Sequence, residues 1–230
     1  MLKINEKILK NLFNSCHIQT LFWLLVFCTI FFISFAYGNK INKEDIIIAL
    51  EKKYSFRSFS TDFTQISKLA ALDITEQASG KAFFSHPGKM KWQYMTPEHH
   101  EIITNGKFLW IYRPEENQVM TGDASQFFKS GTGGAFLSDI SIIRKNYIIN
   151  LKKAGKDYVE IDLTPKKKNP DISFIVVRIS QKNNEITRVV TYNSYNDTTL
   201  FELSNIQFEK INPEIFEFHI PSGVDKIDMN

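Results

Sequence analysis

The spacing of apolar residues changes shortly after Tyr54, from a helical to a strand period. Before it, Asn42 can cap a helix, and Glu44 and Asp45 follow in the first turn, where the helix dipole favours negative charge. The apolar residues of this stretch recur at helical spacing and predict a buried face of Ile46, Ile47, Leu50 and Tyr54. Beyond it, as in "FRSFSTDFTQ", apolar and polar positions alternate as side chains do along a strand. The pattern predicts one helix followed by extended structure.

Turn signals divide the extended part into short strands. Asn105-Gly106 lies between two apolar runs and is a strong signal for a two-residue hairpin turn. Further turns are expected at Ala154-Gly155-Lys156, Asn183-Asn184 and Asn196-Asp197. The runs between such turns number about eleven, and tight turns join antiparallel neighbours. The predicted fold is mainly β, an incomplete antiparallel β-barrel or a highly curved antiparallel sheet.

One strand has an unusual composition. In "HPGKMKWQYMTP" (86–97), the large side chains of Met90, Trp92 and Tyr94 fall on one face, and none of them can act as a nucleophile. The opposite face carries two lysines and a glutamine. A one-sided aromatic strand of this kind favours a role in packing or in binding apolar groups.

The interval 122–145 breaks the strand pattern. Asp123 or Ser125 can cap a short helix, and three glycines between Ser130 and Gly134 let the segment bend. Its apolar residues are Phe127, Phe128, Phe136, Leu137, Ile140, Ile142 and Ile143. Two interpretations stay open: short helices on a hinge that form a lid over the open sheet face, or a helical plug that completes the core.

The first 38 residues have the organisation of a secretory signal peptide. Three lysines and one glutamate precede the uncharged apolar run "LFWLLVFCTIFFISF" (21–35). The run is about 15 residues long, shorter than the roughly 20 that a membrane-spanning helix needs. Small residues at Ala36 and Gly38 favour cleavage after Gly38. We therefore expect a cleaved signal peptide (1–38) and a single domain (39–230).

Two alternatives to cleavage after Gly38 stay open. The apolar run could remain as a membrane anchor, or Cys28 could be lipid-modified, although the bulky Phe27 does not suit a lipoprotein cleavage site. Cleavage would remove both cysteines, Cys16 and Cys28, so the remaining domain could form no disulfide bond. It would also remove three lysines and one glutamate from 28 basic and 25 acidic residues, which leaves a net charge of +1. A nearly neutral domain argues against a nucleic-acid partner.

The residues offer little catalytic chemistry. There is no GxSxG motif, and "GTGG" lacks the lysine and hydroxyl residue that complete a phosphate-binding loop. His99 and His100 are adjacent and would point to opposite faces of a strand, which disfavours a metal site. Glu115 and Glu116 lie in an expected exposed turn rather than a glycosidase-like pair. We predict no catalytic residue, no metal and no cofactor, and thus a protein that is not an enzyme.

Five segments occur together in the order and at about the spacing of a known family. They are "SFSTDFTQ" (58–65), "GKAFFSHPGKMKWQYMTP" (80–97), "IITNGKFLWIYRPEENQV" (102–119), "LTPK" (163–166) and "FEFHIPSGVDKI" (216–227). With them the chain resembles the outer-membrane lipoprotein carrier family, LolA, over nearly all of residues 39–230. The resemblance implies an incomplete barrel with a lid of short helices over an apolar cavity. It also implies a monomeric periplasmic chaperone that carries acylated lipoproteins from an inner-membrane ABC exporter to an outer-membrane receptor.

The resemblance also indicates which residues contact the acyl chains. By the resemblance, Met90 and Trp92 lie on the strand that borders the cavity, and Phe136 and Leu137 fall in the lid; for Trp92, a plain core position stays open as an alternative. With the neighbouring apolar residues of that strand and of the interval 122–145, the expected lipid contacts are Met90, Trp92, Tyr94, Phe127, Phe128, Phe136, Leu137 and Ile140. Carriers of this family often have an arginine directly before the proline of "HP", where it holds the lid closed by bonding to lid backbone; this chain has His86. A neutral imidazole offers one donor and a guanidinium five. Either His86 is a weaker lid latch, or Lys89 or Arg144 supplies one.

Two other functions remain as alternatives. A periplasmic lipid-sensing or lipoprotein-sensing module could use the same sheet to regulate a membrane partner, although a sensor of that type generally needs a second domain. A hydrolase on an unrecognised sheet has only the presence of carboxylates in its favour.

Overall fold

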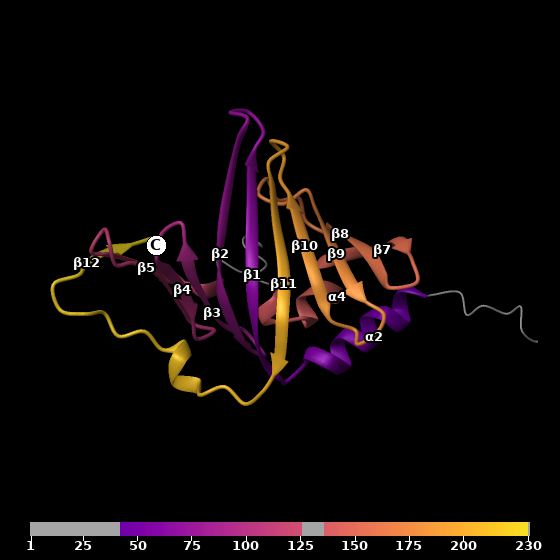
Figure 1. The fold of residues 1–230 in the computed structure, drawn as a ribbon, viewed down its shortest axis with the longest axis horizontal. Helices are drawn as coiled ribbons and strands as arrows, with labels where there is room; N and C mark the ends of the chain where they lie inside the picture. Colours follow the sequence, from indigo (N-terminus) through magenta and orange to yellow (C-terminus); the bar gives the residue numbers. More distant parts are fainter. Residues whose placement is uncertain (1–41, 126–135, 230) are drawn as a thin grey trace, which may run out of the picture. The chain divides into compact units, whose positions relative to one another are not determined.

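The computed structural model describes residues 42–125 and 136–229 (Figure 1). They belong to the second of two compact units of the chain, residues 41–230, which has a hydrophobic core of its own. The predicted signal peptide, Phe127, Phe128 and the glycines of "SGTGG" lie outside the described residues. Among the residues that are described, no helix combines the length and the apolar composition needed to cross a membrane.

The predicted N-terminal helix is confirmed as α2 (Lys43–Tyr54). The Asn42 side chain accepts a hydrogen bond from the Glu44 amide at 3.2 Å and so caps the first turn. Its buried residues are the predicted ones: Ile46, Ile47, Leu50 and Tyr54. The hydroxyl of Tyr54 accepts a buried hydrogen bond from the Ile186 amide at 2.8 Å, which fixes the end of the helix to the sheet.

The strands form one open sheet. Their bounds are β1 (Ser58–Leu69), β2 (Ile74–Ser85), β3 (Lys89–Thr96), β4 (His100–Thr104), β5 (Phe108–Arg113), β6 (Gln118–Asp123), β7 (Tyr147–Ala154), β8 (Tyr158–Pro165), β9 (Phe174–Ser180), β10 (Ile186–Tyr192), β11 (Thr198–Phe208) and β12 (Asp225–Asp228). The twelve described strands lie in the order β12-β6-β5-β4-β3-β2-β1-β11-β10-β9-β8-β7, so β12 and β7 are edges and the sheet does not close into a barrel. The mainly β fold with an unclosed sheet is confirmed.

The predicted turns join the predicted strands, with two differences. The pairing of β4 with β5 ends at Thr104 and Leu109, so the Asn105-Gly106 turn is longer than two residues. The reason is local, because the Asn105 side chain accepts hydrogen bonds from the amides of Lys107 and Phe108 and stabilises the wider loop.

The second difference is β12, which the sequence pattern did not predict. It pairs with β6 in parallel, whereas every other neighbouring pair of described strands is antiparallel. The chain reaches it after β11 through the short 3-10 helix η2 (Pro213–Phe216) and an irregular stretch (Figure 1). The four residues of β12 are all exposed, so no alternation of apolar positions marks them as a strand.

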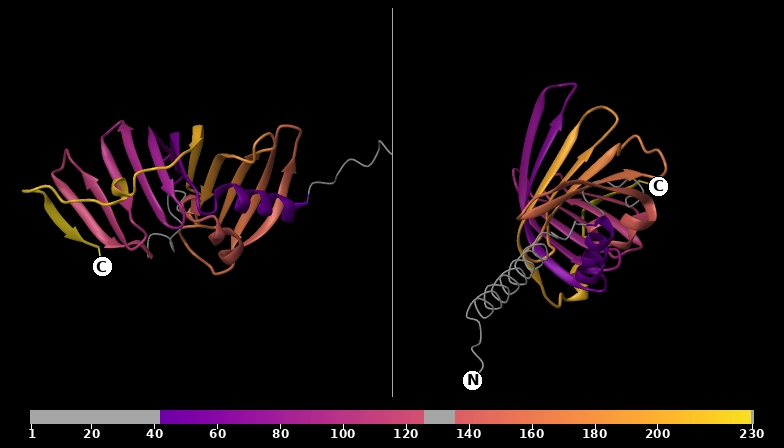
Figure 2. Two further views of the ribbon diagram at one scale, coloured as in Figure 1. Left: turned by 90° about the horizontal axis from the view of Figure 1, so that it is seen from below. Right: turned by 90° about the vertical axis from the view of Figure 1, so that its right-hand side faces the viewer.

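Short helical segments cover one face of the sheet, as predicted for the interval 122–145. Residues 136–138 form a turn of 3-10 helix, and α4 (Ser141–Asn146) follows. Figure 2 shows α2 and α4 on the same side of the sheet, and their buried residues belong to one core with its inner face. The Arg144 guanidinium joins the two helices, at 2.8 Å from Glu44 and 2.9 Å from Glu51.

A glycine allows β2 and β3 to approach closely. Gly80 is opposite Tyr94 and Ser79 is opposite Thr96, so Met95 is an extra residue that makes a bulge in β3. A Cβ atom on Gly80 would lie 1.9 Å from the carbonyl oxygen of Gln93 and 3.0 Å from the Phe63 ring. Because the first of these is backbone, a side chain at residue 80 would require the two strands to separate.

Gly80→Ala should therefore destabilise the domain by about 3 kcal/mol and lower its melting temperature by roughly 10 °C, because the strands must shift to accept the methyl group. Thermal unfolding followed by circular dichroism would measure this. Gly155→Ala in the β7–β8 turn is the matched control, since its Cβ would meet only one atom, at 3.4 Å. Equal melting temperatures for the two variants would contradict the interpretation of the bulge.

Candidate functional site

The one-sided character of β3 is confirmed. Met90, Trp92 and Tyr94 are buried on the inner face, while the three residues between and before them are only partly buried on the outer face. On that outer face Lys91 forms a 3.0 Å ion pair with Glu101 of β4. The alternation places a row of apolar side chains on the inner face of the sheet and a row of polar side chains on its outer face.

Trp92 lies at the centre of an aromatic cluster. Its ring centroid is 4.8 Å from that of Phe63, 5.5 Å from Phe84 and 5.0 Å from Phe201. These partners come from β1, β2 and β11, so four neighbouring strands contribute to the cluster. The phenyl rings bring large contact area and no hydrogen-bonding group that must be satisfied. The four rings are buried, so contact between this wall and an apolar ligand stays a prediction.

Tyr94 forms the polar end of this row. Its hydroxyl donates to the side-chain oxygen of Gln65 at 2.8 Å, and burial raises the pKa of that hydroxyl, which keeps it neutral. Its ring stacks on His100 with centroids 4.0 Å apart. The phenol is therefore satisfied within the protein.

The interval after residue 135 packs directly against this wall. Phe136, Leu137 and Ile140 are buried in the same core as Met90, Trp92 and Tyr94. The structure thus brings together the six predicted lipid-contact residues that it describes, and the other two, Phe127 and Phe128, lie outside the described residues. Since these six side chains are closed to solvent, an apolar cavity between them stays a prediction.

The turn between β2 and β3 holds the 3-10 segment by a backbone hydrogen bond. The Gly88 amide donates to the Ser138 carbonyl at 2.8 Å. On the other side of the turn, the His86 amide donates to the Arg57 carbonyl at 3.1 Å. The turn therefore links the start of β1 to the 3-10 segment through backbone hydrogen bonds.

The His86 side chain lies beneath this segment. It is only 9% exposed, and its Nε2 atom has no hydrogen-bond partner among the described residues. Burial lowers the pKa of the imidazole, and the Leu137 backbone and the Asp139 carboxylate act in the opposite direction with smaller effect. His86 thus contacts the predicted lid as a neutral ring with one unused nitrogen, and its role as a latch stays a prediction.

The two other candidates for the latch lie elsewhere. Arg144 pairs with α2 rather than with residues 136–138, and its hydrogen bonds with Glu51 and Glu44 raise its pKa. The side chain of Lys89 has no hydrogen bond or ion pair within the described part of the chain. Lys166 instead donates to the carbonyls of Arg144 and Lys145 at 2.9 and 3.1 Å and so caps the C-terminal end of α4.

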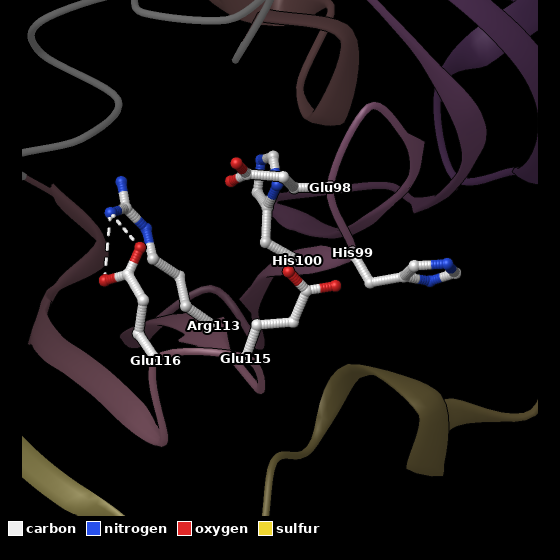
Figure 3. Close-up of a pocket in the computed structure, with 6 residues that line it drawn as sticks. All are labelled: Glu98, His99, His100, Arg113, Glu115 and Glu116. Atoms are coloured by element: carbon white, nitrogen blue, oxygen red, sulfur yellow. Dashed lines mark hydrogen bonds and ion pairs between the residues drawn. The ribbon is translucent and has the colours of Figure 1, made fainter.

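A separate polar pocket of about 240 Å³ contains the two adjacent histidines. It is lined by Glu98, His99, His100, Arg113, Glu115 and Glu116 (Figure 3). The imidazoles of His99 and His100 point in different directions, and Arg113 pairs with Glu116 at 3.0 Å. Residues 42–125 and 136–229 contain no group of three or more histidine, cysteine or acidic side chains placed to hold a metal ion.

Two contributors to the site were missed by sequence reasoning. Phe201 contacts Trp92, but nothing in the local pattern indicates that β11 pairs with β1 rather than with another strand. The Gly88 amide makes the lid contact, and the available signal was the Pro87-Gly88 pair, which marks a turn with a free N–H group. Both depend on which segments meet in space.

Residues 54–219 match the protein family described as outer membrane lipoprotein carrier protein LolA. The chain is 32% identical over 174 residues to the outer-membrane lipoprotein carrier protein of Chromobacterium violaceum, covering 74% of this chain and 81% of that one. It is 22% identical over 174 residues to the protein of the same name from Coxiella burnetii, covering 75% and 82%. A solved structure of an uncharacterized conserved protein from Thermus thermophilus superposes with a TM-score of 0.55 at 9% identity, covering 80% and 98%; that likeness shows the fold alone.

The buried His86 should make stability depend on pH. Because the folded state lowers its pKa, the unfolded chain binds more protons as the pH falls below about 6.5, so the free energy of unfolding decreases there. His86→Gln should reduce this acid sensitivity, as measured by melting temperatures between pH 7.5 and roughly pH 5. His100→Gln is the comparison, since that half-buried ring should contribute less. An unchanged pH profile in His86→Gln would contradict the assignment.

Proposed function

This chain belongs to the LolA family of outer membrane lipoprotein carrier proteins, and we propose that it carries acylated lipoproteins across the periplasm. In this proposal residues 1–38 are removed as a signal peptide, and residues 39–230 act as a soluble monomer. The protein accepts lipoproteins from an inner-membrane ABC exporter and delivers them to an outer-membrane receptor. It acts without catalysis and without a cofactor, in keeping with relatives that are named as carriers.

The observation that carries the proposal is the aromatic wall of four strands covered by a short helical segment. Met90 and Trp92 on the wall are packed against a core that includes Leu137 of the cover. Acyl chains need apolar area and no reactive group, and this interior offers that combination. Met90 also has a flexible, polarisable side chain, which can adapt to acyl chains bound in different positions.

The strength of acyl burial makes a movable cover useful. Burying one methylene group contributes about 0.8 kcal/mol, so a chain of roughly 16 carbons would gain on the order of 10 kcal/mol if fully enclosed. A carrier must later release that chain. In the proposed mechanism the lid is closed without ligand, and opening it offsets part of the binding energy, so that a receptor of higher affinity can take the lipoprotein.

The proposed latch is the turn at residues 86–88. Gly88 supplies the backbone hydrogen bond to Ser138, and His86 lies against the Leu137 backbone with one nitrogen unused. A backbone hydrogen bond together with a contact from a neutral imidazole favours a lid that opens without unfolding the sheet. An arginine in place of His86 would bring more donors to the same carbonyls and hold the lid more tightly.

Lipoprotein release tests the carrier function. Spheroplasts that make a tagged outer-membrane lipoprotein would be incubated with residues 39–230, and the supernatant examined for a soluble complex of the two. Met90→Gln should reduce the yield by about tenfold, because a polar group would replace a buried lipid contact. Met95→Gln on the same strand should not, because Met95 is 49% exposed. Melting curves would confirm that both variants are folded.

Absence of the complex with the folded wild-type domain and an active exporter would contradict the carrier function and favour the sensing alternative. If Met90→Gln and Met95→Gln reduced the yield of the soluble complex equally, the carrier function would still be supported, but the position of its binding site would be wrong.

Native-state hydrogen exchange can distinguish the two interpretations of the interval 122–145, a movable lid or a fixed plug that completes the core. A lid predicts that the Gly88 amide exchanges with an opening free energy several kcal/mol below that of amides in the centre of β1, because its partner Ser138 moves away without global unfolding. His86→Arg should raise the opening free energy of Gly88 and leave β1 unchanged. Exchange of Gly88 only through global unfolding would mean that the segment is a plug.

A further inference from the structure

The turn from α2 to β1 places a phenylalanine in a backbone conformation that suits glycine. The Arg57 amide donates to the Tyr54 carbonyl at 3.2 Å and closes the turn. Ser55 has φ −59° and ψ 134°, and Phe56 has a φ of +57°. These values are typical of a type II turn, whose third position usually holds glycine or asparagine because a Cβ atom is strained there.

The Phe56 ring does not pack against the core, so burial of the side chain does not offset this strain. It is 90% exposed, the highest exposure among the large hydrophobic side chains of the described residues. A bulky residue with positive φ and no buried contact destabilises the fold twice, through the backbone and through exposed apolar surface. Strain without a structural benefit points to a role outside the fold.

The surroundings of Phe56 are basic and partly apolar. An open groove of about 560 Å³ runs beside the turn and is lined by Asp45, Ile48, Ala49, Lys52, Lys53, Arg57 and Asn184. Ile48 is half exposed, and Lys53 is already paired with Glu185 at 3.1 Å. Lys52 and Arg57 form no ion pair within the described part of the chain. The groove is therefore left with more positive than negative charge.

We propose that Ile48, Lys52, Phe56 and Arg57 form a docking surface for an anionic membrane. An exposed aromatic ring can enter the boundary between headgroups and acyl chains, while lysine and arginine beside it attract negative headgroups. The turn lies where α2 leads into β1 (Figure 1), and it leaves 90% of the Phe56 side chain exposed. None of its four residues is among the predicted lipid contacts, and the vesicle test below needs no bound lipoprotein.

The docking surface also adjoins the proposed latch. The carbonyl of Arg57, the residue after Phe56, accepts the hydrogen bond from the His86 amide. Docking at Phe56 therefore places the 86–88 turn, and the segment that it holds, close to the bilayer.

Vesicle flotation tests the docking surface with residues 39–230, which contain the whole second compact unit with its own core. Wild-type protein should bind vesicles of phosphatidylcholine and phosphatidylglycerol, bind phosphatidylcholine alone more weakly, and lose affinity as salt screens the charges. Phe56→Asn should reduce affinity about tenfold, and Phe56→Trp should retain it. Arg57→Glu should reduce it by more than the roughly fivefold expected for losing one basic residue.

Stability separates this proposal from a structural role for the ring. Phe56→Gly should melt at the same temperature as the wild type or higher, because glycine relieves the backbone strain, and yet it should bind vesicles weakly. Leu72→Asn in the β1–β2 turn is the matched control, since Leu72 is also exposed but lies outside the basic surface. The proposal is overturned if no vesicles are bound, if neutral and anionic vesicles bind equally, or if Leu72→Asn reduces binding as much as Phe56→Asn.

Discussion

Covering the inner face of an unclosed sheet is the constraint on which this structure depends. A closed barrel can bury its interior with its own strands, but here β7 and β12 remain edges and the aromatic residues between them need another element above them. Helix α2 and the segment that includes residues 136–146 supply that element. The stability of the domain and the accessibility of its interior are consequently set by the same contacts.

The two parts of the cover are attached in different ways. Helix α2 is held by a buried hydrogen bond from Ile186 to Tyr54 and by four buried side chains. The 3-10 segment contacts the β2–β3 turn through the hydrogen bond from Gly88 to Ser138 and through apolar packing, and α4 after it is tied to α2 by Arg144. Apolar packing is not directional, so a segment of this kind can exchange its protein contacts for contacts with an acyl chain. In the proposed carrier, residues 136–138 are the part of the cover that moves and α2 is the part that stays.

Much of this arrangement could be predicted from local patterns. The cap at Asn42, the buried face of α2 and the inward row of β3 each depend on residues close together in the sequence, where periodicity is informative. The family resemblance then identified six side chains that the structure brings into one core.

What could not be predicted depends on contacts between distant segments. The ring of Phe201 joins the Trp92 cluster only because β11 lies beside β1. Arg144 pairs with α2 rather than holding residues 136–138 only because α4 lies beside that helix. The exposure of Phe56 is a further case, since an apolar residue before a strand looks like part of the core until the turn places it outside. The spacing of apolar residues predicts which face of a helix or strand is buried, but the order of the strands in the sheet determines which residues that face contacts.

The parallel strand β12 has a consequence for solubility. Without it, the backbone N–H and C=O groups of β6 would form the free edge, next to the buried Val119, and an exposed edge can pair with a second molecule. Asp225, Lys226 and Asp228 place charged side chains on the edge that replaces it. A short, charged and exposed outer strand is a poor template for further pairing. The last strand of the sheet therefore protects the domain from aggregation, even though it buries almost nothing.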